Sequence, residues 1–381
     1  MVGNKEKDGI FDMKTKQEQP DFIKDLWRIM NRVKVIGNRE GKFLGFCIGN
    51  TAKKIDADFF FTPIRNTSCC VCGSVVIDRM SFAEILFQEL DGQVDYFFVD
   101  TEKKISPELY TDHDVGNVER TARKMAQRTK VLTYKGNDLT VDTVDVFLAQ
   151  ICDWDERGLG GKKIAIIGLG NIGFKLALKL MERGGEVHVV RRHAAKLRTM
   201  VDALNMAKPR GTIAKVCGST NITDAMKDAD VVIGLTPGTH DIQPEMIATL
   251  KSKSILIDAG KGSFSPEAVR AAENRGLVVW RSNIQAAFEA QITLLLKTEA
   301  AIKQSYGRGI IEGIPIVSGG IVGAAGEIVV DNVHAVTEIY GVADGAGDFK
   351  RELSAEEKAI LERLNSILLH SNKNTELKEQ S

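Results

Sequence analysis

Residues 161–192 read GKKIAIIGLGNIGFKLALKLMERGGEVHVVRR, and they set the expectation for the whole chain. A short apolar run (164–167) leads into a glycine-rich turn, an amphipathic segment follows, and a valine-rich run (187–190) comes next. This order is typical of the strand, glycine turn, helix and strand that open a dinucleotide-binding sheet. We therefore expect an α/β fold in which a Rossmann-type doubly wound parallel sheet is joined to a second, N-terminal α/β domain.

The glycines of the turn have different expected tasks. Gly168 permits the tight turn, Gly170 lets the backbone approach a pyrophosphate, and Gly173 lets the helix sit against its strand. The helix N-terminus adds free N–H groups for the anion. Together with the tight exit of a later buried strand, these features give the expected cofactor contacts Gly168, Gly170, Asn171, Ile172, Gly173, Thr236 and Pro237. The alternative is a glycine-tight turn that has lost its ligand.

The end of the second strand indicates which nucleotide binds. NAD sites usually carry Asp or Glu there to accept from the ribose 2′-hydroxyl, whereas NADP sites need cations for the 2′-phosphate. In this chain the strand ends in Arg191 and Arg192. NADP is therefore the expected cofactor and NAD is the alternative. Two solvated arginines without a ligand are the third interpretation.

The composition excludes several classes of partner. Lys+Arg and Asp+Glu both number 51, so the formal net charge is zero and nothing favours nucleic acid. No apolar run approaches the roughly 20 residues of a membrane-spanning helix, and the charged N-terminus lacks a signal-peptide core. We expect no membrane partner, a cytoplasmic location and a small-molecule substrate, and a homodimer is left open.

The chain has six cysteines, which we expect to be reduced in a cytoplasmic protein. Three of them form the cluster Cys69, Cys70 and Cys72. No second Cys or His pair stands nearby in the sequence to complete a four-ligand metal site. The cluster therefore predicts buried thiols rather than a metal.

Alternating strand-like and helix-like runs divide the chain. The first strand of the N-terminal domain is expected at Val33–Ile36. The expected parts are a loose polar leader at 1–25, an N-terminal α/β domain with substrate and catalytic residues at 26–145, the Rossmann domain at 146–285, a returning helix and glycine-rich segment at 286–348, and a charged helical tail at 349–381.

This arrangement resembles the shikimate dehydrogenase-like group, which includes the methylenetetrahydrofolate dehydrogenases. In shikimate dehydrogenases a Lys after a strand and an Asp that opens the crossing helix form the catalytic pair. The similar positions here are Lys104, or its neighbour Lys103, and Asp142. A glutamine in the returning helix resembles Gln285 or Gln291, which implies a substrate contact. The sequence of the nucleotide segment is also similar to that of D-2-hydroxyacid dehydrogenases.

The resemblance implies an NADP-dependent dehydrogenase or reductase of biosynthesis, acting on a small polar, shikimate-like hydroxy or keto compound. The Lys gives the hydroxyl proton as its ammonium or takes it as its amine, and the Asp orients the Lys. Methylene-pterin or methylene-folate dehydrogenases and D-2-hydroxyacid-type dehydrogenases are the enzymatic alternatives. A non-catalytic NADP(H)-binding sensor or interaction protein is the alternative of another class, and loop charges in water are the plain interpretation of the Lys and Asp.

Overall fold

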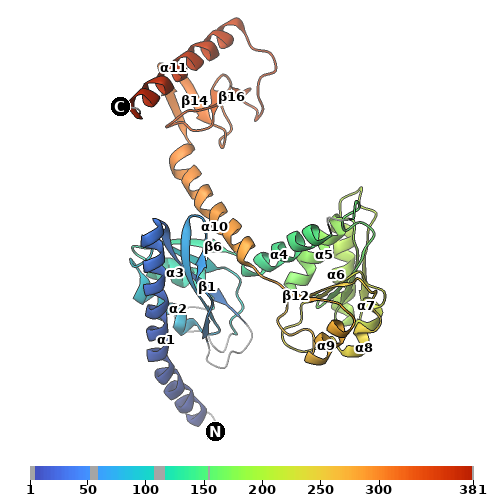
Figure 1. Ribbon diagram of the computed structural model, residues 1–381. Coiled ribbons are helices and arrows are strands. Elements are labelled where there is room, and N and C mark those ends of the chain that lie inside the picture. The colour runs from blue at the N-terminus through green and yellow to red at the C-terminus, as the bar shows by residue number, and fades with distance from the viewer. Residues whose placement is uncertain (1–4, 52–58, 107–115, 153–154, 380–381) are drawn as a thin grey trace. The chain divides into compact units, whose positions relative to one another are not determined.

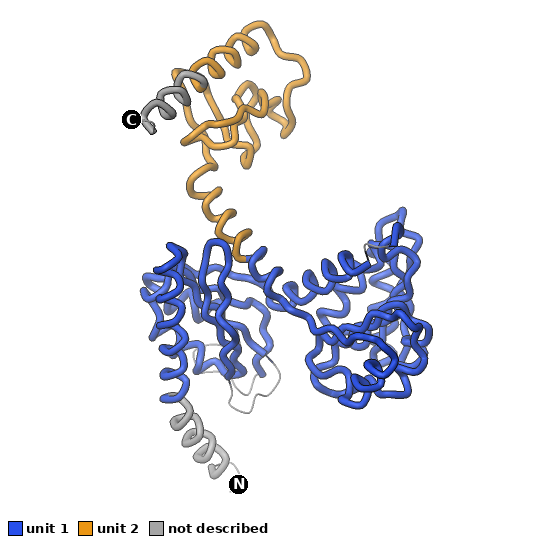
Figure 2. Tube along the Cα trace, viewed as in Figure 1, with its two compact units in different colours: residues 1–291 blue, residues 292–381 orange. Residues whose placement is uncertain are grey.

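The computed structural model describes residues 5–51, 59–106, 116–152 and 155–379. The chain forms two compact units, residues 1–291 and 292–381, which Figure 2 shows in different colours. The first unit holds two largely parallel sheets with helices packed against them (Figure 1). The expected α/β class is therefore confirmed.

The first sheet has the strand order β2-β4-β1-β5-β6. Its four long strands are parallel, and β2 and β3 pair with β4 in the antiparallel sense. The strands are β1 (Phe43–Asn50), β2 (Phe59–Phe61), β3 (Arg65–Asn66), β4 (Cys70–Ile77), β5 (Tyr96–Asp100) and β6 (Lys130–Tyr134). The helices of this part are α1 (Lys5–Glu40), α2 (Met80–Leu90) and α3 (Val118–Met125).

Helix α1 corrects the expected start of this domain. Val33–Ile36 is the last part of a helix and not a strand. Phe22, Leu26, Met30 and Val33 recur every three or four residues and are fully buried in the core beneath the sheet. This helical spacing outweighs the β propensity of the short β-branched run. Phe22 also lies in the predicted loose leader, yet it belongs to the core.

The second sheet is entirely parallel, in the order β12-β11-β10-β7-β8-β9. The first of these strands along the chain lies inside the sheet, and the order reverses beside it, as in doubly wound dinucleotide folds. Its strands are β7 (Lys163–Ile167), β8 (Glu186–Val190), β9 (Val216–Ser219), β10 (Val231–Gly234), β11 (Ile255–Asp258) and β12 (Val279–Arg281). Its helices are α4 (Gly136–Ile151), α5 (Asn171–Glu182), α6 (Ala194–Ala207), α7 (Ile222–Met226), α8 (Pro244–Ile247) and α9 (Pro266–Asn274).

Helix α4 belongs to the core of this second sheet. Val141, Val144 and Leu148 are buried in the same apolar cluster as Ile164 of β7 and Leu176 of α5. The expected domain boundary at residue 145 therefore falls inside a helix. The crossing segment joins the second domain from its first turns onward.

His188 of β8 gives this sheet a predicted acid sensitivity. Burial, and then the positive charge of Lys163, lower the pKa of His188. The unfolded chain thus binds a proton more readily, and stability falls as the pH drops through about 6.5, the unfolded value. His188→Gln should reduce this loss, by less than about 1.4 kcal/mol for each unit of lowered pKa, because the half-buried imidazole is screened by water and the full loss is reached only below both pKa values. Urea unfolding of both proteins at pH 7.5 and 5.5 measures it; equal losses would contradict the assignment.

The second unit has its own sheet and its own core. The glycine-rich segment forms β13 (Arg308–Ile311), β14 (Ile314–Ser318), β15 (Ile328–Val330) and β16 (Ile339–Val342), paired in that order. Ile316, Ile328, Val330 and Val342 are buried together with Leu364 of α11 (Ala355–Glu379). Helix α10 (Gln285–Ala300) begins in the first unit and continues as a π-helical turn, Ala301–Ser305.

Candidate functional site

The glycine turn between β7 and α5 has the geometry that its sequence predicts. Gly168 has a φ of +114°, a conformation that suits glycine. A Cβ on Gly173 would lie 2.2 Å from the carbonyl oxygen of Gly168, so the helix can approach its strand only without a side chain there. A Cβ on Gly170 would meet no protein atom within 4 Å. The chain therefore leaves space beside Gly170 that a ligand can occupy.

A cleft of about 380 Å³ opens at this turn. Its wall is formed by the ends of β7, β8 and β10 and the start of α7, with the residues 167–170, 190–193, Thr220, Ile222, 235–237 and Asp241. Oγ1 of Thr236 and Nε of Arg191 are buried there without a hydrogen-bond partner among the described residues. Since buried polar atoms normally have partners, these two suit a polar ligand, and the cleft lies where doubly wound sheets bind dinucleotides.

The two arginines at the end of β8 are placed differently. Nη1 of Arg191 donates to the carbonyl oxygen of Leu169, which fixes this guanidinium against the glycine turn. Arg192 is exposed at the rim and makes no ion pair with a described residue. Thr220, which follows β9, also lines the cleft and was not predicted. A lone hydroxyl after a strand is too common to single out from sequence.

The predicted Thr236-Pro237 loop is held by groups that sequence did not indicate. Oγ of Ser263 accepts from the N–H of Thr236 at 3.1 Å and donates to its carbonyl oxygen at 2.9 Å. Asp258 in turn accepts from the N–H groups of Gly262 and Ser263 at 2.7 and 3.2 Å. The loops after β10 and β11 are thus bound to each other at the edge of the cleft.

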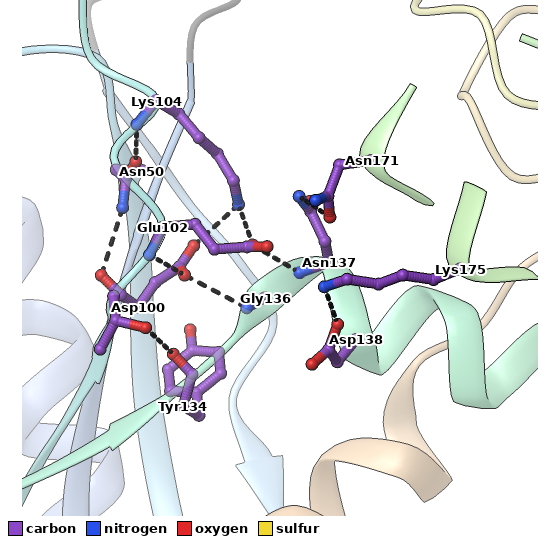
Figure 3. A network of polar contacts seen from close by, with 11 residues as sticks. Asn50, Asp100, Glu102, Lys104, Tyr134, Gly136, Asn137, Asp138, Asn171 and Lys175 are labelled. Carbon is purple, nitrogen blue, oxygen red and sulfur yellow. Dashed lines mark hydrogen bonds and ion pairs between the residues drawn. The ribbon is translucent and has the colours of Figure 1, made fainter. Parts of the chain in front are cut away.

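Lys104 lies in a polar network at the carboxyl end of the first sheet (Figure 3). Its Nζ is 2.9 Å from Oδ2 of Asp100 and 2.9 Å from Oε2 of Glu102. Its backbone N–H donates to Oδ1 of Asn50, whose Nδ2 donates to the carbonyl oxygen of Asp100. The lysine is therefore held at its ammonium by two carboxylates and at its backbone N–H by Asn50.

The same carboxylates cap helix α4. Oδ1 of Asp100 accepts from the N–H of Gly136 at 3.2 Å, and Oε2 of Glu102 accepts from the N–H of Asn137 at 2.8 Å. Negative groups stabilise a helix N-terminus, where the first N–H groups lack partners within the helix. Asp100 and Glu102 were not predicted; their signal in the sequence is that they flank the strand end before Lys104.

The predicted pair of Lys104 and Asp142 is not formed. Oδ1 of Asp142 is 2.9 Å from Nζ of Lys179 in α5, and this hydrogen bond raises the pKa of Lys179. Asp142 follows Gly136 by six residues, or about 9 Å along the helix, so it lies away from the end where Lys104 binds. Lys103 is exposed and makes no ion pair with a described residue.

Asp142 is one member of a row of ion pairs between α4 and α5. Both sets of side chains recur every three or four residues, which places each set along one face of its helix. The pairs are Asp138 with Lys175, Asp142 with Lys179, and Asp145 with Arg183. Arg183 binds the buried Asp145 through two nitrogens, at 2.6 and 2.9 Å. The carboxylate of Asp142 thus holds two helices together.

A second, polar pocket of about 320 Å³ is lined by Thr101, Thr133, Tyr134, Lys135, Asp138 and Gln291. Gln291 is one of the two glutamines that the resemblance placed at the substrate. Oε1 of Gln285, the other, accepts from Nη1 of Arg65 at 3.0 Å. Burial raises the pKa of Tyr134 well above its usual value, so its phenol stays protonated at neutral pH.

The pocket and the glycine turn are joined by side chains of α4 and α5 (Figure 3). Nδ2 of Asn137 donates to Oδ1 of Asn171, the first residue of α5, at 3.2 Å. Asp138, which lines the pocket, binds Lys175 one turn further along α5. A molecule in the polar pocket would therefore lie near α5, the helix that begins at the glycine turn.

Cys70 and Cys72 of the cysteine cluster lie on β4 of the first sheet, whereas Cys69 precedes this strand and is only partly buried, so the prediction of buried thiols is wrong for Cys69. Cys70 and Cys72 are fully buried, with their sulfurs 3.4 Å apart. The hydrogen bond to Cys72, together with burial, raises the pKa of Cys70. Across the described residues, no three His, Cys, Asp or Glu side chains are arranged to hold a metal ion. No helix in that described part has the length and apolarity to cross a membrane.

A known family matches the part of the chain that forms most of the second sheet. The family model described as "NADP oxidoreductase coenzyme F420-dependent" matches residues 163–262. Mitochondrial glutamate dehydrogenase of Dictyostelium discoideum is 31% identical over 130 residues, which are 32% of this chain and 26% of that protein. Glycerol-3-phosphate dehydrogenase [NAD(P)+] of Bacillus subtilis (strain 168) is 28% identical over 118 residues, or 29% of this chain and 34% of that protein.

The chain thus spans only about a quarter to a third of the length of these curated relatives. Among solved structures, L-tryptophan dehydrogenase from Nostoc punctiforme is similar with a TM-score of 0.37 and 16% identity, covering 65% of this chain and 72% of that one. The family match runs from β7 to the loop after β11, which are the elements that build the cleft. This segment is a Rossmann-type NAD(P)-binding domain similar to those of oxidoreductases.

Proposed function

We propose that the chain is an NADP-dependent oxidoreductase that moves hydride between nicotinamide and a small polar hydroxy or keto compound. The observation that carries this proposal is the cleft at Gly170, where open space, unpartnered polar atoms and two arginines stand together. The family match over residues 163–262 supports it. The polar pocket beside α5 supplies a place for the second reactant.

The residues of the chain would divide the work as follows. The glycine turn and the first N–H groups of α5 bind the pyrophosphate, and Arg192 binds the 2′-phosphate. The bound nicotinamide supplies hydride transfer. Lys104 gives a proton to the carbonyl oxygen of the keto compound as its ammonium, or takes the hydroxyl proton in the reverse direction as its amine, with Asp100 and Glu102 orienting the side chain in place of Asp142. Gly136 stands in the sequence between the pocket residues Lys135 and Asp138. A Cβ on Gly136 would lie 3.4 Å from Nζ of Lys104.

The finer proposal concerns the substrate. A shikimate-like ring acid, a D-2-hydroxy acid and a methylene-pterin or methylene-folate remain the alternatives. The Lys104–Asp142 pair that favoured shikimate is not formed, so we propose the broader class of small hydroxy or keto compounds. A screen of shikimate, quinate, D-2-hydroxy acids and methylenetetrahydrofolate for NADP-linked absorbance change tests this. Tight NADPH binding with no turnover across the set would instead favour the non-catalytic sensor.

Cofactor choice is tested at Arg192. Arg192→Ala should weaken NADP binding by about 10- to 100-fold, the worth of a hydrogen bond to a charged group, and leave NAD binding nearly unchanged. Titration of NADPH and NADH by fluorescence measures both affinities. Arg210→Ala, another exposed arginine of the same domain outside the cleft, is the matched control. Tighter binding of NAD than NADP by the unaltered chain would overturn the choice.

A further inference from the structure

The polar pocket lies where the ends of β5 and β6 meet the helices α4 and α10. Thr101 follows β5, Thr133 and Tyr134 end β6, and Lys135 is the residue immediately before α4. Gln291 of α10 and Asp138 of α4 complete its wall. At about 320 Å³ it is near the lower end of the range for small-molecule sites. A metabolite of modest size fits there, whereas a large ring system does not.

The charges of the wall do not cancel. Asp138 is bound to Lys175 of α5, so its carboxylate is already neutralised. Lys135 is exposed, its side chain does not cap the helix, and no described residue pairs with its ammonium. The partial charge of the α4 N-terminus is met by Asp100 and Glu102. The cation left for a ligand among the wall residues is therefore Lys135.

The neutral groups of the wall favour a hydroxylated or oxo compound. Oγ1 of Thr101 donates to the carbonyl oxygen of Tyr134 at 3.3 Å, which leaves the oxygen of that hydroxyl able to accept. Thr133 and Gln291 add a hydroxyl and an amide, both able to donate and to accept. Such groups match hydroxyls and carbonyls of a substrate, and the lining residues include no Ala, Val, Leu, Ile, Met or Phe.

We propose that the polar pocket binds a small acid with at least one further hydroxyl or oxo group, and that Lys135 is the residue that binds its carboxylate. The inference rests on the proposed function, because it names the substrate class of that same reaction. Lys135 anchors one end of the acid at the start of α4. The hydroxyl or oxo group at the other end then lies against the threonine hydroxyls and the amide of Gln291 in the wall.

Direct binding of matched probes tests this without turnover. D-glycerate, malate and quinate are each compared with the corresponding neutral amide by saturation-transfer NMR and calorimetry, on the full chain saturated with NADP. At least one acid should bind, and more tightly than its amide. Lys135→Glu should weaken that acid about 10- to 100-fold, and Lys135→Arg should keep it within about threefold. The affinity of the amide should not change in either variant.

The control is Lys124→Glu, which reverses the charge of an exposed lysine on α3 outside the pocket and should leave acid binding unchanged. The NADP affinity of every variant is measured in the same series. If the proposed function itself is wrong, this series shows it, because the unaltered chain then does not bind NADP. If NADP binds but no acid does, or if Lys135→Glu binds the acid as tightly as the unaltered chain, the inference is overturned.

Discussion

Gly170→Val should abolish binding of the nucleotide while the chain stays folded. Gly170 is the residue before α5, with extended backbone angles that valine also adopts (φ −96°, ψ −156°). A Cβ there meets no protein atom within 4 Å, so the side chain starts in open space and the chain should still fold. The space that it fills is the space through which a pyrophosphate reaches the backbone and the first N–H groups of the helix.

NADPH fluorescence titration measures the lost affinity, and thermal unfolding checks the fold. Gly173→Ala is the contrasting variant, because its Cβ would lie 2.2 Å from a backbone oxygen and should destabilise the chain itself. Retained NADPH binding in a folded Gly170→Val protein would show that the nucleotide binds elsewhere.

Lys104→Ala should lower the free energy of unfolding by about 3 kcal/mol, the cost of removing one partner of a buried ion pair. The side chain of Asp100 is only 2% exposed and that of Lys104 24%, so the remaining carboxylates of Asp100 and Glu102 would face each other with little water. Asp142→Ala should cost about 0.5 kcal/mol, because both partners of its pair with Lys179 are more than two-fifths exposed.

The double variant Lys104→Ala, Asp142→Ala tests whether the two residues act as a pair, as the sequence suggested, or separately, as in the structure. Lys104 and Asp142 have different partners, so the two losses should add to within about 0.5 kcal/mol. Urea unfolding of the single and double variants measures the sum. Adding Asp100→Asn to Lys104→Ala should restore part of the stability, since it removes the unpaired charge. An interaction energy well above 1 kcal/mol between Lys104 and Asp142 would mean that they act as a pair after all.

The glycine turn and the second sheet could be predicted because their signals are local. Gly168, Gly170 and Gly173 stand between a short apolar run and a segment with helical spacing of its apolar residues. Each of these features can be recognised within a few residues of sequence. The repeated strand and helix pattern then leaves few arrangements for a parallel sheet. Thr236 and Pro237 line the cleft as predicted because the carboxyl ends of neighbouring parallel strands meet at one edge.

The partners of charged side chains could not be predicted, because they are set by packing between distant segments. Asp142 stands near the start of the crossing helix, and the sequence does not indicate whether it faces Lys104 or the helix α5. Arg191 and Arg192 are adjacent, yet one binds a carbonyl oxygen and the other is exposed. The first helix was also mistaken for a strand at Val33–Ile36, since its buried positions become clear only over many turns.

Helix α4 starts at the polar pocket and is fastened along its length to α5, the helix that starts at the nucleotide turn. We therefore expect a ligand at either place to act on the position of this pair of helices. Thermodynamic linkage then imposes a reciprocal relation on the two ligands: the factor by which nucleotide changes the affinity for the acid must equal the factor by which the acid changes the affinity for nucleotide. Replacing Asp145, which forms the ion pair with Arg183, should loosen the contact between α4 and α5 and bring both factors toward one.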